Sequence, residues 1–357
     1  MIDFRYHLVS LVSVFMALAI GVVLGAGPLN KSLGDTLNNQ VQALRTDKEA
    51  LQQAVDNRDA DIAAQDEYIA AIGSSVASEQ LTGLSVTVLS LPGAVAQDVE
   101  AVTARVEAAG GTVTSVVAVQ PKWTDPAESA FRSELAGQLV QYINPRPSAE
   151  LGTDGELGVL LSRALVTTGP VPAERDADGV SILEGLQAAE LVTVTEDAPA
   201  LADLAVVVSG MPEEAAGAQD PEWAERENGS YLALLTELDA ASAGTTLAGP
   251  VRSDGNGLVA ELRTDAPLTE EISTVDGVGT AAGRLSVVLA LRQQAAGQAG
   301  QYGTGEGAQA VLPPIDVPTG SVEPGPADPT AEPTQDPPAE PTQEPTAEPT
   351  GSPSGDG

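Results

Sequence analysis

The chain has 357 residues with 51 acidic and 16 basic side chains, a formal net charge of −35, and no cysteine. A chain this acidic repels phosphate backbones and anionic lipid surfaces, which excludes nucleic acid as a partner. The lack of cysteine excludes disulfides. An aromatic content of 3% predicts a core of small aliphatic side chains.

Residues 8–29 form an uncharged, mainly apolar segment after a short N-terminus that contains Arg5 and His7. As a helix this segment would be roughly 33 Å long, which matches a hydrocarbon core of about 30 Å. The apolar region of a secretory signal usually has only about 7–15 residues. We therefore predict an uncleaved, single-pass anchor in the cell membrane, with residues 1–7 in the cytoplasm and the bulk of the chain outside. A signal peptide cleaved near Ala26 is the alternative.

Residues 33–80 carry a heptad pattern that predicts a coiled-coil stalk. Nine of the twelve a and d positions are apolar and five of the six a positions are β-branched, which favours a parallel homodimer. Two charged side chains and one amide interrupt this pattern and weaken it. A helix packed on its own globular domain is the alternative. The predicted seam consists of Leu37, Val41, Leu44, Lys48, Leu51, Val55, Arg58, Ile62, Gln65, Ile69, Ile72 and Val76.

Residues 84–303 predict an extracytoplasmic α/β domain, because strand and helix periodicities alternate along them. A strand, a helix and a second strand over 84–91, 94–109 and 112–119 indicate a βαβ unit, and hence a parallel strand pair. Further helices are expected over 128–143, 156–166, 181–189, 229–240 and 280–294, and further strands over 191–195, 204–210 and 245–249.

Residues 304–357 are rich in proline, threonine and glutamate, and thirteen of the 26 prolines lie after residue 311. Such a composition cannot bury enough apolar surface to fold, so we predict a disordered, extended spacer. Binding of this acidic tail to a cationic partner or to wall material is the alternative.

Candidate chemistry is scarce in the predicted domain. The single histidine, His7, lies before the apolar segment, so a catalytic Ser–His or Cys–His arrangement in the domain is excluded. The stretch "GVGTAAG" (277–283) imitates a dinucleotide-binding loop, but its third glycine is one residue late, and we interpret it as a turn before a helix with Thr280 as N-cap. Copper and zinc prefer thiolate, thioether and imidazole ligands. The residues therefore indicate no cofactor.

Two stretches resemble an actinobacterial family of copper transport outer-membrane proteins, the MctB-like family. They are "MIDFRYHLVSLVSVFMALAIGVVLGAGPL" at the N-terminus and "STVDGVGTAAGRLSVVLAL" (273–291) followed by "GQYG" (300–303). The resemblance implies a location in the cell envelope, in the outer membrane by the family's assignment, and a role in copper export or homeostasis. It also implies kinship with membrane partners of a cell-separation protein that act through the coiled coil and the periplasmic domain.

Three functions are compatible with these observations. The residues favour a non-enzymatic, membrane-anchored, dimeric scaffold for envelope, division or cell-separation partners. The resemblance favours a component of copper efflux, with copper as the only ligand it implies. A wall hydrolase that uses paired carboxylates is the third, although no spacing selects two of them. The expected partners are a second copy of the chain, the membrane through residues 8–29, and an envelope or division protein. No catalytic, cofactor-binding or metal-binding residue is predicted.

Overall fold

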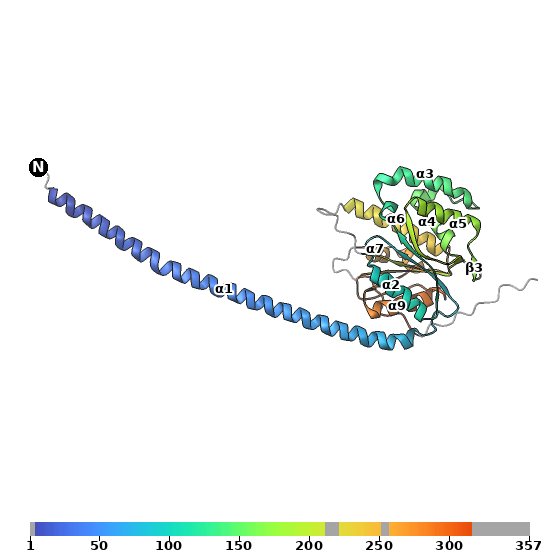
Figure 1. The fold of residues 1–357 in the computed structure, drawn as a ribbon, viewed down its shortest axis with the longest axis horizontal. Helices are drawn as coiled ribbons and strands as arrows, with labels where there is room; N and C mark the ends of the chain where they lie inside the picture. The colour runs from blue at the N-terminus through green and yellow to red at the C-terminus, as the bar shows by residue number, and fades with distance from the viewer. Residues whose placement is uncertain (1–3, 211–220, 251–256, 316–357) are drawn as a thin grey trace, which may run out of the picture. The chain divides into compact units, whose positions relative to one another are not determined.

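The computed structural model describes residues 4–210, 221–250 and 257–315. Figure 1 shows an N-terminal helix followed by a domain, called the head below, in which helices cover both faces of a sheet. The expected fold class, α/β with an N-terminal apolar helix, is confirmed. The predicted tail over 304–357 lies mostly outside the described residues.

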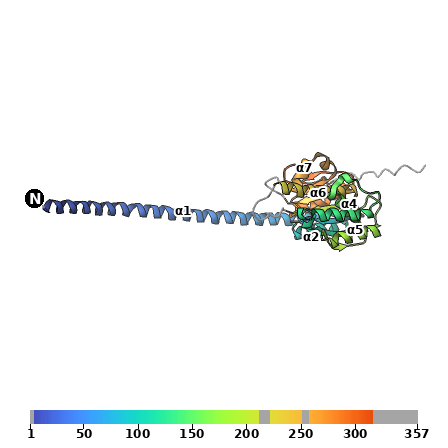
Figure 2. The same cartoon turned by 90° about the horizontal axis from the view of Figure 1, so that it is seen from above.

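The N-terminal helix α1 (Phe4–Ala77) is 74 residues long. The sequence predicts two separate segments over 8–29 and 33–80, whereas the backbone forms one unbroken helix, which Figure 2 shows along its length. Its first part, Phe4–Leu24, has a mean hydropathy of 2.4 and none of it is buried. Among the described residues this is the one segment long and apolar enough to cross a membrane.

The head is built on a sheet of seven strands, as far as the described residues show, in the order β4-β2-β1-β6-β7-β8-β9. All neighbouring pairs are parallel except β2 with β4, which are antiparallel. The predicted parallel pairing of the first two strands is therefore confirmed. The strands are β1 (Ser85–Ser90), β2 (Thr112–Val119), β4 (Val192–Asp197), β6 (Leu204–Val208), β7 (Gly244–Gly249), β8 (Ser273–Asp276) and β9 (Gln301–Tyr302), with a separate pair β3 (Ala173–Glu174) and β5 (Ala200–Leu201).

Side chains of the central strands alternate between two apolar cores, one on each face of the sheet. In β6, for example, Val206 packs into one core and Val207 into the other, and both are fully buried. This double burial explains why β6 is a continuous apolar run in the sequence. Figure 1 shows α2 (Ala96–Ala108) and α9 (Ala281–Gln294) on one face and α4 (Gly152–Leu165), α5 (Ala177–Ala188) and α6 (Pro221–Ala240) on the other.

The sequence predicts most of the larger elements to within a few residues and misses the short ones. The predicted strand over 112–119 coincides with β2, whereas α6 begins eight residues earlier than the predicted start at residue 229. The helix predicted over 128–143 is shorter, because α3 (Ser129–Leu139) passes into a 3-10 turn, Val140–Tyr142. The elements not predicted are α7 (Leu258–Thr264), α8 (Ala266–Glu271), β3, β5, β8 and β9.

Candidate functional site

Helix α1 carries an apolar stripe on its surface, formed by the predicted seam residues from Leu37 to Ile62. The large apolar side chains of this stripe are Leu37, Val41, Leu44, Leu51, Val55 and Ile62, and each is between 43% and 68% exposed. The polar seam residues Lys48 and Arg58 are exposed as well. Singly exposed apolar residues are common on proteins, but a row of six along one helix face is typical of a contact surface.

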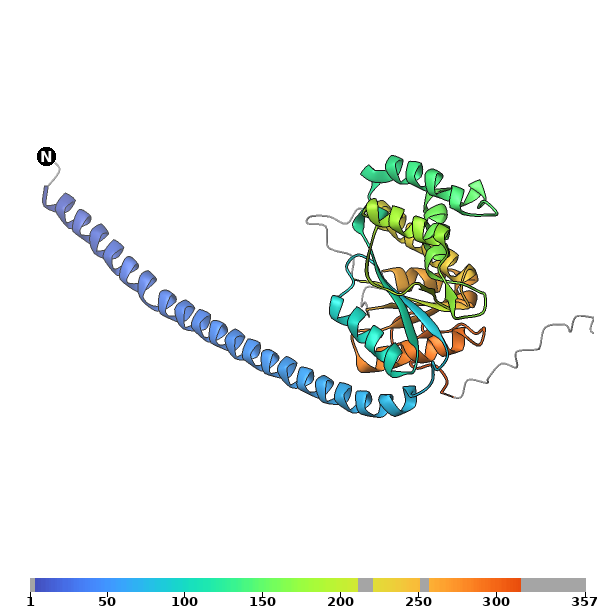
Figure 3. The ribbon, with the colours of Figure 1, turned by 45° about the vertical axis from the view of Figure 1, so that its right-hand side comes forward.

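The last turns of α1 pack on the head instead. A Cβ atom added to Gly73 would lie 3.4 Å from the Leu285 side chain of α9, and Ala77 is buried. Val76 is half-buried and packs against the core that contains α9. Figure 3 shows these turns beside α9. The alternative of a helix packed on its own domain therefore holds for this part of α1.

Asp66 marks the point where α1 reaches the head. Its Oδ1 atom accepts a hydrogen bond from the backbone N–H of Ala281, the first residue of α9, at 3.0 Å. Its Oδ2 atom lies 4.0 Å from the Arg284 guanidinium. The predicted N-cap of α9 is confirmed, because Thr280 Oγ1 accepts from the Gly283 N–H at 3.0 Å. The Asp66 carboxylate and the Thr280 hydroxyl thus accept from N–H groups that have no partner within α9. The negative charge of Asp66 also interacts favourably with the positive end of the helix dipole.

The remaining predicted seam residues follow this division. Gln65 is exposed, Ile69 is half-buried, and Ile72 is 48% exposed. The structure thus brings the seam residues onto one helix but gives them two environments. Asp66 is not among the predicted residues, because an acidic residue in an acidic stalk shows no pattern that links it to α9.

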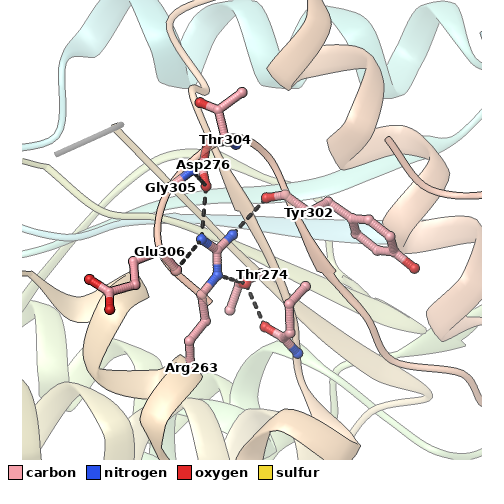
Figure 4. A network of polar contacts seen from close by, with 8 residues as sticks. Arg263, Thr274, Asp276, Tyr302, Thr304, Gly305 and Glu306 are labelled. Carbon is pink, nitrogen blue, oxygen red and sulfur yellow. Dashed lines mark hydrogen bonds and ion pairs between the residues drawn. The ribbon is translucent and has the colours of Figure 1, made fainter. Parts of the chain in front are cut away.

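A buried ion pair between Arg263 and Asp276 fastens the C-terminal end of the head (Figure 4). Arg263 Nη1 lies 2.8 Å from Asp276 Oδ2, and both side chains are less than 5% exposed. The guanidinium also donates to the Thr274 hydroxyl at 2.8 Å and to the Tyr302 carbonyl at 2.6 Å. The Asp276 carboxylate accepts further from the backbone N–H of Thr304, at 2.8 Å. These groups are used within the protein, so the pair is a structural clamp.

In open α/β sheets, ligands usually bind next to the carboxyl ends of the parallel strands. In this head those strand ends belong to β1, β6, β7 and β8. Two hollows open to solvent there, with about 420 and 330 Å³ of empty space, and share Ser209, Gly210 and Leu258. Burial raises the pKa of the Glu227 carboxyl at this edge, while Tyr231 donates a hydrogen bond to it. Their linings include Gly210, Pro250 and Gly257, and we assign the hollows no ligand.

Metal ligands do not gather in the part of the chain that the structure describes. No group of three or more His, Cys, Asp or Glu side chains there could hold an ion. Ser209, at the edge with the hollows, donates to the Ala248 carbonyl at 3.3 Å and has no histidine beside it, since the chain's single histidine is His7.

These features define a class of protein: a three-layer α/β head on a long N-terminal helix whose first part is apolar enough to span a membrane. Within that class the chain belongs to the MctB family, described as copper transport outer membrane proteins, whose model matches residues 1–313. The resemblance drawn from the two sequence stretches is thereby confirmed.

Relatives that match most of this chain are named copper transporters. A protein of Mycobacterium tuberculosis (strain ATCC 25618 / H37Rv) named copper transporter MctB is 32% identical over 323 residues, which are 87% of this chain and 99% of the relative. The protein of the same name from Mycobacterium leprae (strain TN) is 30% identical over 328 residues, or 88% of this chain and 100% of the relative. Copper transport is thus the role shown at the level of the family.

Proposed function

We propose that this protein is a single-pass membrane protein of the cell envelope, and that it acts in copper homeostasis as a dimeric, non-enzymatic scaffold for other envelope proteins. The observation that carries the proposal is the exposed apolar stripe of α1 between Leu37 and Ile62. A stripe of this length, left open beside a membrane anchor, is suited to bind another helix.

The occupant we propose is the same stripe of a second copy, in parallel orientation. Anchors of two copies in one membrane hold both N-termini at the same surface, so only the parallel orientation aligns the two stripes. Lys48 and Arg58 in the stripe weaken the pairing of free helices. Confinement to a membrane raises the effective concentration and offsets this weakness.

Composition favours an indirect part in copper handling. The side chains that bind copper in proteins are thiolates, thioethers and imidazoles. The full sequence has no cysteine, His7 as its one histidine, and Met1, Met16 and Met211 as its methionines. We therefore propose that copper is bound by partners that the head and stalk hold in place. The second candidate, a copper efflux component that binds the ion itself, is supported by the family and by the names of the relatives.

The dimer is tested on the full chain in lipid nanodiscs or mild detergent, by single-molecule mass measurement and by pull-down from membrane extracts. The variant Val55→Asp/Ile62→Asp places charges in the stripe and should remove the dimer and the captured partners. The control Gln53→Asp/Ala60→Asp adds the same charges to exposed positions on the opposite face of α1 and should change neither. Unchanged dimers in the stripe variant would overturn the proposal.

The two copper roles are separated by titrating the full chain with Cu(I) in the presence of a competing chelator. The indirect role predicts no stoichiometric Cu(I) binding, in wild type or in a His7→Gln/Met16→Leu/Met211→Leu variant. Tight binding of one ion per chain that this variant loses would establish the second candidate instead.

A further inference from the structure

The face of α1 that carries the exposed stripe continues into the face that α9 covers. Going along the helix in steps of three and four, the stripe passes from Val55 through Ile62 and Asp66 to Ile69 and Gly73. The members up to Ile62 are exposed, whereas Asp66 and Gly73 contact α9 of the same chain and Ile69 between them is half-buried. This face of α1 is therefore covered by α9 in its C-terminal part and is uncovered in the part before Asp66.

A second helix cannot occupy the part that α9 holds. In a parallel pair the a positions of both helices lie at the shared axis, and those positions in the last turns are Ile69 and Val76. Both are already half-buried, Val76 packs against the core that contains α9, and Ala77 beside it is 1% exposed. Pairing of α1 with a second copy beyond Asp66 would require α9 to leave this face, together with the Asp66 bond to the Ala281 N–H.

Two residues fit α9 better than they fit a partner helix. In a parallel pair Asp61 of one copy would lie near Asp66 of the other, and like charges repel there. On α9, Asp66 instead meets a helix N-terminus and Arg284. Gly73 weakens a free helix by about 1 kcal/mol relative to alanine. On α9 a small residue is required at this position, because the Leu285 side chain lies 3.4 Å from where a Cβ would be.

We infer that the two copies pair over residues 37–65 only, and that the helices separate at Asp66, where α9 of each chain takes the place of the partner helix. This inference rests on the dimer proposed above and proposes pairing over fewer residues than the predicted stalk, 33–80. It also makes Asp66 the boundary between the surface that joins the copies and the surface that carries each head.

Single cysteines test this boundary in the full chain, which has none of its own. Variants Val55→Cys and Ile62→Cys lie in the pairing segment and Ile72→Cys lies beyond it. Each is treated in nanodiscs with a short bis-maleimide. We expect covalent dimers from the first two and at least tenfold fewer from Ile72→Cys. Gln53→Cys, on the opposite face of α1, gives the background.

Ile72 is 48% exposed, so its replacement should leave the fold intact and the thiol reactive. Labelling with a monofunctional maleimide verifies that reactivity, and Ile69→Cys provides a second reporter beyond the boundary. Cross-linking at residue 72 or 69 as efficient as at residue 55 would overturn the inference while leaving the dimer in place. Failure to cross-link at residues 55 and 62 would overturn the dimer itself and the inference with it.

Discussion

The carboxylate of Asp66 in α1 accepts a hydrogen bond from the backbone N–H of Ala281, 215 residues further along the chain. It therefore acts as an N-cap for α9 from outside that helix and joins the stalk to the head. The arrangement matters because α9 is almost entirely buried and lies against the central strands.

Replacing Asp66 with alanine should lower the free energy of unfolding of the head by about 1 kcal/mol, the usual loss when a helix N-cap is removed. Urea unfolding, followed by the fluorescence of the buried Trp123, measures this change. Glu67→Ala, at an exposed neighbouring position, is the matched control and should change stability by less than half as much. Equal effects of the two variants would remove the capping role of Asp66.

The contact at Gly73 predicts opposite outcomes for a small and a large substitution. Gly73→Ala adds a Cβ at ordinary contact distance from Leu285 and should be neutral or stabilise the protein by up to about 1 kcal/mol, through helix propensity. Gly73→Leu should destabilise the joint by about 1–3 kcal/mol, because the added side chain overlaps Leu285. Hydrogen exchange in residues 66–81 reports the loosening directly. Equal exchange in both variants would contradict the close packing.

The clamp between Arg263 and Asp276 predicts a large loss on breaking one side. Arg263→Met should lower the free energy of unfolding by about 3–5 kcal/mol, because it leaves a buried carboxylate without its cation. The double variant Arg263→Met/Asp276→Asn should be less damaged than Arg263→Met alone, since no buried charge remains. Chemical denaturation of wild type, both single variants and the double variant measures the free energies of unfolding for this comparison. A double variant that loses the sum of both single effects would show that the two residues act independently.

Asp239, near the C-terminal end of α6, predicts a pH dependence of stability. Burial raises the pKa of its carboxyl from 3.8 to about 6, although a hydrogen bond from the Thr245 N–H opposes the shift. Because the pKa is higher in the folded state, the protonated group stabilises the fold below about pH 4, and this stabilisation is lost as the pH rises through 6. The difference in free energy of unfolding between Asp239→Asn and wild type should therefore shift in favour of the variant as the pH rises from 4 to 7.5. The expected shift is roughly 1 kcal/mol after allowance for partial exposure.

The measurement for Asp239 is the free energy of unfolding of both proteins at several pH values across this range. Thr236→Ser, a neutral change one turn earlier in α6, should follow the wild-type curve. Parallel curves for Asp239→Asn and wild type would show that the carboxyl titrates alike in the folded and unfolded chain.

The sequence predicts the elements whose pattern is local. Strand β2 is predicted to the residue, and β6 and α9 to within two residues, because period-2 alternation, a continuous apolar run and a Thr280 N-cap are each local signals. The helices α7 and α8 have seven and six residues, too few to show a helical period. Strands β8 and β9 have four and two residues, and their pairing depends on chain far away in sequence.

The sequence by itself determined the apolar N-terminal helix, the stripe along α1 and the α/β class, because composition and periodicity record which faces avoid water. The family was indicated by two stretches that resemble it, at the N-terminus and over 273–303. Only the tertiary structure decided where the stripe stops being free and which charges are paired. Asp66 with Ala281, and Arg263 with Asp276, join residues whose roles arise from the meeting of distant segments. A single acidic or basic residue carries no local pattern that names its partner, so such pairs are visible only after folding.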